Sequence, residues 1–111
     1  MTPEQQRIAI AEACGWTDIR PQKIGNDHDL WGTKDGRRNR IHNYLNDLNA
    51  MHEAEIHAYK TQPAGWMLRY EEALSEVCSK AQYPHWCDWC ATAAQRAEAF
   101  LRTLNLYTPT P

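Results

Sequence analysis

The chain has 111 residues, of which 42% are hydrophobic and 23% charged, a composition typical of one soluble globular domain. Its formal net charge of -2 argues against a general nucleic-acid binder, because such proteins present a strongly basic surface. No apolar run reaches membrane-spanning length, and the first residues are too polar for a signal peptide. We therefore expect a cytoplasmic domain whose four cysteines remain thiols.

The first helix is marked at both ends. Thr2 and Gln5 form a Thr-x-x-Gln capping box, and Pro3 suits the first helical position. Gly15 is a natural C-terminal stop. The predicted buried stripe consists of Ile8, Ala11 and either Cys14 or Ala9.

Residues 16 to 43 show no helical period. Within them, the stretch HDLWGTKDGRRNRI contains Asp35-Gly36, a favoured pair for a two-residue hairpin turn. The sequence therefore predicts a hairpin at this point, with flanking strands that are short and polar.

Two further helices are predicted from apolar residues that recur at intervals of three and four. The second covers about residues 45 to 60, and the third about residues 64 to 80. After the third helix, Tyr83-Pro84 is expected to break the chain. One face of the second helix carries Leu48, Met51, His52, Glu55 and Tyr59. The stripe of the third helix is Met67, Tyr70, Leu74, Val77 and Ala81.

The last helix has the clearest start and end signals. Thr92 and Gln95 form a second capping box, Asn105 is placed to end the helix, and Leu106-Tyr107 can fold back onto the core. Its narrow apolar seam is Ala94, Ala97, Leu101 and Leu104. These elements predict a single α+β domain over residues 1–111, predominantly helical, with about four helices, a short β component and a frayed tail from residue 107.

The stretch HWCDWC, residues 85 to 90, raises the question of a metal or redox site. Cys87 and Cys90, with His85, are the candidate metal ligands, but no second ligand pair stands at a supporting spacing. A redox pair would need a βαβ pattern, which is absent. Buried cysteine packs as a small hydrophobe, so we interpret the stretch as a core strand with a partly exposed aromatic face.

The segment CATAAQRAEAFLRTLNLY, residues 90 to 107, closely resembles the C-terminal signature of small bacteriophage proteins called the phage ABA sandwich family. YLNDLNAMHEAE, residues 44 to 55, resembles the family's central helix, and AEACGW, residues 11 to 16, the end of its first helix. The resemblance implies a small α/β domain encoded by a phage or prophage and used inside the infected bacterium, and it implies no catalytic activity. Residues 25 to 42 and 82 to 89 depart from the family pattern, so a function specific to this chain is expected there.

No spacing in the sequence singles out a catalytic set. A cysteine of HWCDWC could act with His52 or His85 as nucleophile and base, and His52, Glu55 and Cys90 are the first residues to consider if a ligand is converted. His57 comes one residue too late for a His-Glu-x-x-His zinc-protease motif, and no phosphate-cradling glycine loop is present. The sequence therefore favours a non-enzymatic protein without a cofactor.

Basic and aromatic residues gather in the first segment that departs from the family pattern. Arginine binds phosphate oxygens through two hydrogen bonds and aromatic rings stack on bases, so the combination predicts a site for a nucleotide-sized ligand. The candidate ligand-binding residues are Trp16, Trp31, Lys34, Arg37, Arg38, Arg40, Tyr44, Asn49, His52, Trp89 and Arg96. The structural alternatives are a solvated loop for the basic segment, a helix cap for Asn49, a hydrogen-bonded core histidine for His52 and an ion pair to the second helix for Arg96.

Phages use small proteins to sequester the nucleotide signals of bacterial immunity, and the resemblance suggests the same setting for this chain. We therefore expect a non-enzymatic counter-defence protein of the host bacterial cytoplasm that sequesters a small nucleotide-type ligand. The alternatives are an inhibitor that docks on a host defence protein through an aromatic patch, a structural or regulatory phage protein, and a zinc-binding module. The sequence allows a homo-oligomer, and we expect no membrane contact and no general nucleic-acid binding.

Overall fold

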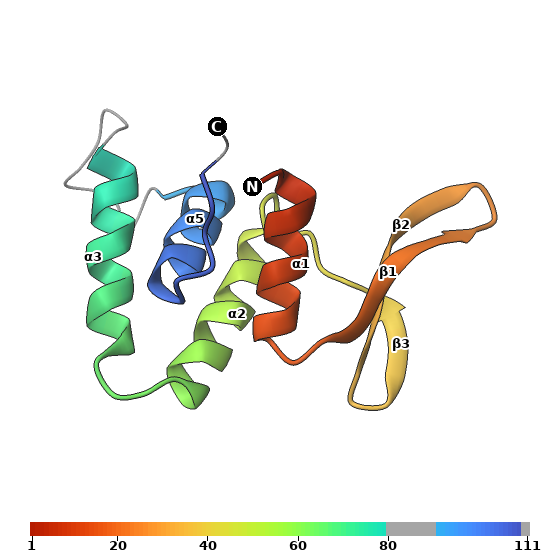
Figure 1. Ribbon diagram of the computed structural model, residues 1–111, viewed down its shortest axis with the longest axis horizontal. Coiled ribbons are helices and arrows are strands. Elements are labelled where there is room, and N and C mark those ends of the chain that lie inside the picture. The colour runs from red at the N-terminus through yellow and green to blue at the C-terminus, as the bar shows by residue number, and fades with distance from the viewer. Residues whose placement is uncertain (80–90, 110–111) are drawn as a thin grey trace.

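Four helices and a three-stranded antiparallel sheet form the part of the chain that the computed structural model describes, residues 1–79 and 91–109 (Figure 1). In chain order the elements are α1 (Pro3–Ala13), β1 (Thr17–Ile24), β2 (Asp27–Lys34), β3 (Arg37–Arg40), α2 (Leu48–Thr61), α3 (Trp66–Ser79) and α5 (Ala93–Thr103). The helices lie together, and the sheet extends from them beyond α1 (Figure 1). The predicted fold class, a small and mainly helical α+β domain, is confirmed.

The ends of α1 follow from its local sequence. The Thr2 hydroxyl accepts the Gln5 N–H at 3.1 Å and the Gln5 side chain accepts the Thr2 N–H at 2.8 Å, so the predicted capping box is present. Gly15 has a φ of 95°, a left-handed conformation that glycine adopts without strain. The N–H of Trp16 bonds back to the Ala11 carbonyl at 3.0 Å, a helix end that turns the chain toward the sheet.

The predicted start and end signals of α5 are confirmed as well. Thr92 begins the predicted capping box. Asn105 has a φ of 59°, and the N–H of Leu106 bonds to the Leu101 carbonyl at 2.8 Å, so the chain turns back at this point. Tyr107 packs against the core as predicted, and the Thr108 carbonyl accepts a hydrogen bond from the N-terminal amino group, so the chain is held past residue 107, where the frayed tail was predicted to begin.

The β2–β3 hairpin turns at the predicted place, but the sheet is larger than the sequence predicts. Asp35 and Gly36 have φ values of 54° and 75°, and a type I′ turn requires two successive positive values. β1 is not predicted, because this edge strand contains Pro21 and its register shifts between Thr17 and Arg20. Such a strand lacks the regular alternation by which strands are found in a sequence.

Three aromatic rings form the centre of the helical core. Trp66 stacks on Tyr70 with the ring centroids 5.0 Å apart, and Phe100 of α5 meets Trp66 edge-on at 5.8 Å. All three side chains are buried. The packing of α3 against α5 therefore gives a structural role to one of the five tryptophans of the chain.

The face that α2 buries differs from the predicted one. Its buried residues are Ala50, Met51, Ala54 and Ala58. Leu48 and Tyr59, predicted on the buried stripe, are 44% and 68% exposed. Alanine allows neighbouring helices to approach closely, an advantage that a pattern weighted by the largest apolar residues misses. On α5, Ala97 and Leu101 are buried as predicted, whereas Ala94 is exposed.

The stripes predicted for α1 and α3 lie close to the observed ones. On α1, Cys14 is buried as predicted, and Ile10 rather than Ile8 is the fully buried isoleucine. On α3, Tyr70 and Leu74 are buried as predicted.

Residues 80–90 lie outside the described part of the chain. The predictions that fall there are the last residue of the third helix's stripe, the chain break, the HWCDWC strand, the ligand candidate and the metal candidates: Ala81, Tyr83-Pro84, residues 85–90, Trp89, and His85, Cys87 and Cys90. Within the described ranges, no cluster of three or more histidine, cysteine or acidic side chains is arranged to hold a metal. No helix in the same ranges is long and apolar enough to cross a membrane.

Candidate anion-binding site

A hollow of about 480 Å³ lies between the end of α1, the β2–β3 turn and the segment after β3. This volume is within the range of small-molecule sites. Its lining residues are Trp16, Lys34, Asp35, Arg37, Asn39 and His42. We call it the turn hollow. It brings together three of the predicted ligand-binding residues, Trp16, Lys34 and Arg37.

Trp16 is the largest side chain of the turn hollow and is mostly buried against the sheet. The end of α1 directs Trp16 toward β2, where Gly32 leaves room for the indole. A Cβ atom at Gly32 would come within 3.2 Å of Trp16 Cε3 and within 3.0 Å of an Ile19 side-chain carbon. The glycine in the middle of β2 is therefore what allows the indole to approach the strand.

The hairpin register brings Lys34 and Arg37 directly opposite each other. Paired residues of an antiparallel hairpin point to the same face, so both cations lie on the side of the turn hollow. Lys34 Nζ lies 5.9 Å from the centroid of the Trp16 ring. The Arg37 side chain is exposed and makes no ion pair or hydrogen bond with any residue in the described ranges.

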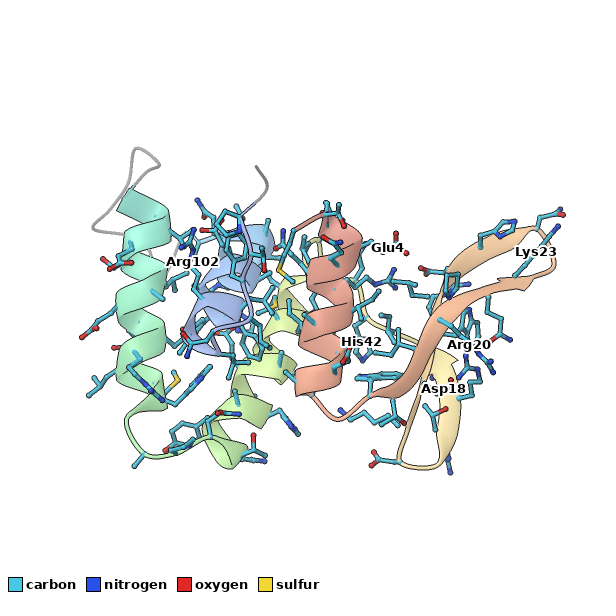
Figure 2. All side chains as sticks on the ribbon, in the orientation of Figure 1. Glu4, Asp18, Arg20, Lys23, His42 and Arg102 are labelled. Atoms are coloured by element: carbon cyan, nitrogen blue, oxygen red, sulfur yellow. The ribbon has the colours of Figure 1, made fainter. Side chains whose placement is uncertain are left out.

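His42 completes the lining from the segment after β3. Its ring meets the rings of Trp16 and Tyr44 edge-on, at centroid distances of 5.9 and 5.8 Å. Its Nε2 lies 3.8 Å from Glu53 Oε2, and half of its side chain is exposed. Figure 2 shows His42 between α1 and the sheet, whereas Arg20 lies on the side of the sheet away from the helices.

The predicted basic cluster is divided between the two faces of the hairpin. Arg38 follows Arg37 directly, and successive residues of a strand point to opposite faces. Arg38 Nε donates to Gln22 Oε1 at 3.0 Å, and Arg38 Nη1 lies 3.3 Å from a carboxylate oxygen of Asp18. Residues of β1 therefore hold Arg38, which does not line the turn hollow.

Arg40 and Trp31 share the outer face with Arg38. They are paired across β2 and β3, and Arg20 of β1 pairs with Trp31 from the other side. The Arg40 guanidinium lies 5.8 Å from the Trp31 ring centroid, and Arg40 Nε lies 3.4 Å from a carboxylate oxygen of Asp29. The structure thus places both predicted ligand residues outside the turn hollow.

Tyr44, predicted as a stacking surface, is a core residue and does not line the turn hollow. Its side chain is buried, and burial raises the pKa of the hydroxyl far above its usual range. Cys14 is buried as well, which raises the pKa of its thiol to about 11. A thiol with that pKa is a poor nucleophile at neutral pH.

Among the helical candidates, Arg96 has the ion pair to α2 that was its alternative, whereas Asn49 is not the cap of its helix and His52 is exposed rather than a core residue. The Asp47 side chain caps α2 by accepting the Asn49 N–H at 2.9 Å. Glu55 Oε1 lies 3.1 Å from His52 Nδ1, and Glu55 Oε2 lies 3.3 Å from Nη1 of the buried Arg96. Asn49, His52 and Arg96 do not line the turn hollow.

A polar joint fastens the sheet to α1 beside a second hollow of about 430 Å³. Arg7 Nη1 donates to Asp29 Oδ1 at 2.6 Å, and Arg7 Nε donates to the His42 carbonyl at 2.8 Å. The Ile41 carbonyl accepts a further hydrogen bond from Arg7 Nη2. The hydrogen bond from Arg7 lowers the pKa of Asp29 below its usual value. Glu4, which also lines this hollow, lies on the side of α1 that faces the sheet (Figure 2).

Sequence reasoning missed Asn39 and His42. Strand alternation starting from Arg37 could have placed Asn39 on the same face. Nothing in the sequence marks His42, because its position depends on how the segment after β3 passes Trp16.

The fold and the site together define a small α+β protein with a cationic hollow lined by an indole and an imidazole. Comparisons with protein-family models, with curated proteins and with solved structures found no match to the chain.

Proposed function

We propose that the protein binds a small phosphorylated ligand of the nucleotide type in the turn hollow. One observation carries the proposal: Lys34 and Arg37 stand opposite each other on the face that Trp16 lines. Two adjacent cations repel each other, and a phosphate group between them provides the oxygen acceptors that both side chains require. Arg37 has no partner in the described ranges, so its hydrogen-bond donors are available to such a ligand.

The remaining lining residues suit the other parts of a nucleotide. The Asn39 amide can donate to and accept from a sugar or base. The exposed half of the His42 side chain offers a ring on which a base can stack. Asp35 is the one acidic residue among the described lining, so the two fixed cations leave the hollow with a net positive charge.

We infer that the ligand is held rather than converted. The described lining residues include no serine, threonine or cysteine, and the thiol of Cys14 is buried with a raised pKa. Retention without turnover lowers the free concentration of a ligand. With the resemblance to phage proteins, this property suggests counter-defence in the cytoplasm of a bacterial host, by sequestration of a nucleotide signal.

Calorimetry against cyclic dinucleotides and ADP-ribose derivatives tests the proposal. Arg37→Ala is expected to weaken binding about 10- to 100-fold, since a hydrogen bond to a charged group contributes about 1.5–3 kcal/mol. Arg38→Ala is the matched control. It removes the same charge from the adjacent residue on the opposite face, so we expect a change of a few-fold at most.

Equal losses from Arg37→Ala and Arg38→Ala would show that the two faces are not distinguished and that the turn hollow is not the site. Binding of no compound on the panel would also count against the proposal. Chromatography of each mixture detects turnover, and a converted ligand would identify an enzyme instead of a protein that sequesters.

A further inference from the structure

α2 exposes a second apolar stripe on the side opposite its buried alanines. The stripe consists of Leu48, His52, Ile56 and Tyr59, whose spacing of four, four and three residues places them on one face. Leu48, Ile56 and Tyr59 are 44%, 55% and 68% exposed. They are three of the five large apolar side chains exposed in the described ranges. A surface helix normally has charged residues on its outer face, so this apolar stripe indicates a contact surface.

The two ends of this stripe differ in shape. Leu48 projects at the first turn of α2. At the last turn, Tyr59 lines a hollow of about 220 Å³, whose other described lining residues come from the α2–α3 connection and the start of α3, Gln62 through Met67. One end therefore offers a projecting aliphatic side chain, and the other a recess of a size that accepts such a group.

The two ends also differ in charge. Asp47, the exposed N-cap of α2, carries a negative charge at the end with Leu48. Lys60, exposed in the last turn, carries a positive charge at the end with Tyr59. Two such helices packed antiparallel bring each Asp47 toward a Lys60, whereas parallel packing brings like charges together.

We propose that two copies of this chain associate through the α2 stripe as an antiparallel, two-fold symmetric dimer. Leu48 of each copy lies against Tyr59 and the hollow of the other, and His52 of each lies near Ile56 of the other. A second copy in the reverse direction satisfies shape and charge at both ends of the stripe, which is the property of an isologous interface. One helix pair buries less area than a standard interface, so the dimer is expected to be weak and concentration-dependent.

Sedimentation velocity of the full chain, from low-micromolar to sub-millimolar concentration, tests the association. We expect the average mass to rise from one chain toward two with concentration. Ile56→Glu is expected to raise the dissociation constant about tenfold or more, because it places a charge at the centre of the apolar contact. Leu68→Glu is the matched control: Leu68 is 67% exposed on α3, outside the stripe, so the dissociation constant should not change. Circular dichroism verifies that both variants are folded.

Photo-crosslinking tests the direction of packing. A ¹⁴N-labelled chain with benzoylphenylalanine in place of Tyr59 is mixed with ¹⁵N-labelled chain before irradiation. A link between two copies then gives crosslinked peptides that contain both isotopes. We expect mixed links to the peptide that contains Leu48. A chain that remains monomeric at every concentration overturns the proposal, as do links between copies that avoid the first turn of α2. In host lysate, a monomer that crosslinks from this position to one host polypeptide would show that the stripe binds a host protein instead.

Discussion

The sheet and the remainder of the molecule divide the charge of the chain unequally. Residues 17–40, which form the sheet and its turns, carry six basic and four acidic side chains, whereas the rest of the chain carries six basic and ten acidic ones. A formal net charge of -2 therefore combines a basic sheet with an acidic remainder. An anionic ligand is attracted to the first and repelled by the second. The total charge of a small protein is thus a poor guide to its ligands when its elements differ this much.

The same two regions differ in what stabilises them. The helices share an aromatic centre of Trp66, Tyr70 and Phe100, with small side chains on the facing helices. Among the strand residues with a described side chain, Leu30 and Gly32 are the buried ones. The sheet instead depends on Trp16 and on the ion pair between Arg7 and Asp29. Substitutions in the helices should therefore act through packing, and those at the sheet through a few specific contacts.

The largest effect is expected inside the helical region. Ala97→Asp places an unpaired charge at a fully buried position of α5, and we expect it to cost about 3–5 kcal/mol of the unfolding free energy. Urea denaturation measures the loss. Ala94→Asp is the control, because Ala94 is exposed near the N-terminus of the same helix, where an acidic residue is tolerated or favoured. Comparable losses from both variants would mean that α5 does not bury the face described here.

A smaller loss is expected at the joint between the two regions. Asp29→Asn removes the ion pair to Arg7, and we expect it to lower the unfolding free energy at neutral pH by about 1.5–3 kcal/mol. The folded pKa of Asp29 lies below the usual 3.8, so its contribution is complete above that pH and is lost as the pH falls through the folded pKa. The difference between wild type and variant should therefore shrink in acid.

Urea denaturation at a series of pH values measures that difference. Asp18→Asn is the matched control, since Asp18 is an exposed carboxylate of the same sheet and its ion pairs lie at the surface. We expect it to change the unfolding free energy by less than about 1 kcal/mol. A loss from Asp29→Asn that stays constant down to the most acid pH would show that the carboxylate charge is not what joins the sheet to α1.

Sequence reasoning succeeded where the determinants are local. Thr2, Gly15, Thr92 and Asn105 each specify a helix end through hydrogen bonds that span a few residues, and all four are observed. The turn at Asp35-Gly36 is local in the same sense. These signals require no knowledge of what packs against the element, so they can be predicted from a short window.

Sequence reasoning failed where an element depends on residues that are distant in the chain. β1 depends on pairing with β2, and its own residues, interrupted by Pro21, give no strand pattern. The buried face of α2 is set by the close approach of other helices, which favours Ala54 over the larger Tyr59. Arg37 and Arg38 are adjacent residues of the same type. The register of the hairpin decides that Arg37 lines the turn hollow and that Arg38 contacts β1. The sequence therefore predicted three of the residues that line the turn hollow, Trp16, Lys34 and Arg37, but not how they are arranged.

Gly32 and Gly25 have different roles in the sheet: the first leaves room for Trp16, and the second adopts a left-handed turn conformation. Alanine at either position is expected to lower stability less than Ala97→Asp does. Gly32→Ala places a methyl group 3.2 Å from both the Trp16 ring and the Thr17 carbonyl and 3.0 Å from the Ile19 side chain, so these neighbours must give by a few tenths of an ångström. Overpacking of this kind costs about 1–3 kcal/mol, partly offset by the 0.5–1 kcal/mol that alanine gains over glycine in a strand. Gly25→Ala meets no atom within 4 Å but is strained at a φ of 63°, so we expect a loss of about 1–2 kcal/mol.

The two glycine variants should then separate in calorimetry with the nucleotide panel. Gly32→Ala displaces the indole that lines the turn hollow and is expected to weaken ligand binding, whereas Gly25→Ala changes a turn that contributes nothing to the lining and should leave affinity unchanged. Similar stability with different affinity would connect the position of Trp16 to the site. Full affinity in Gly32→Ala, despite lower stability, would show that the indole supports the sheet without shaping the ligand site.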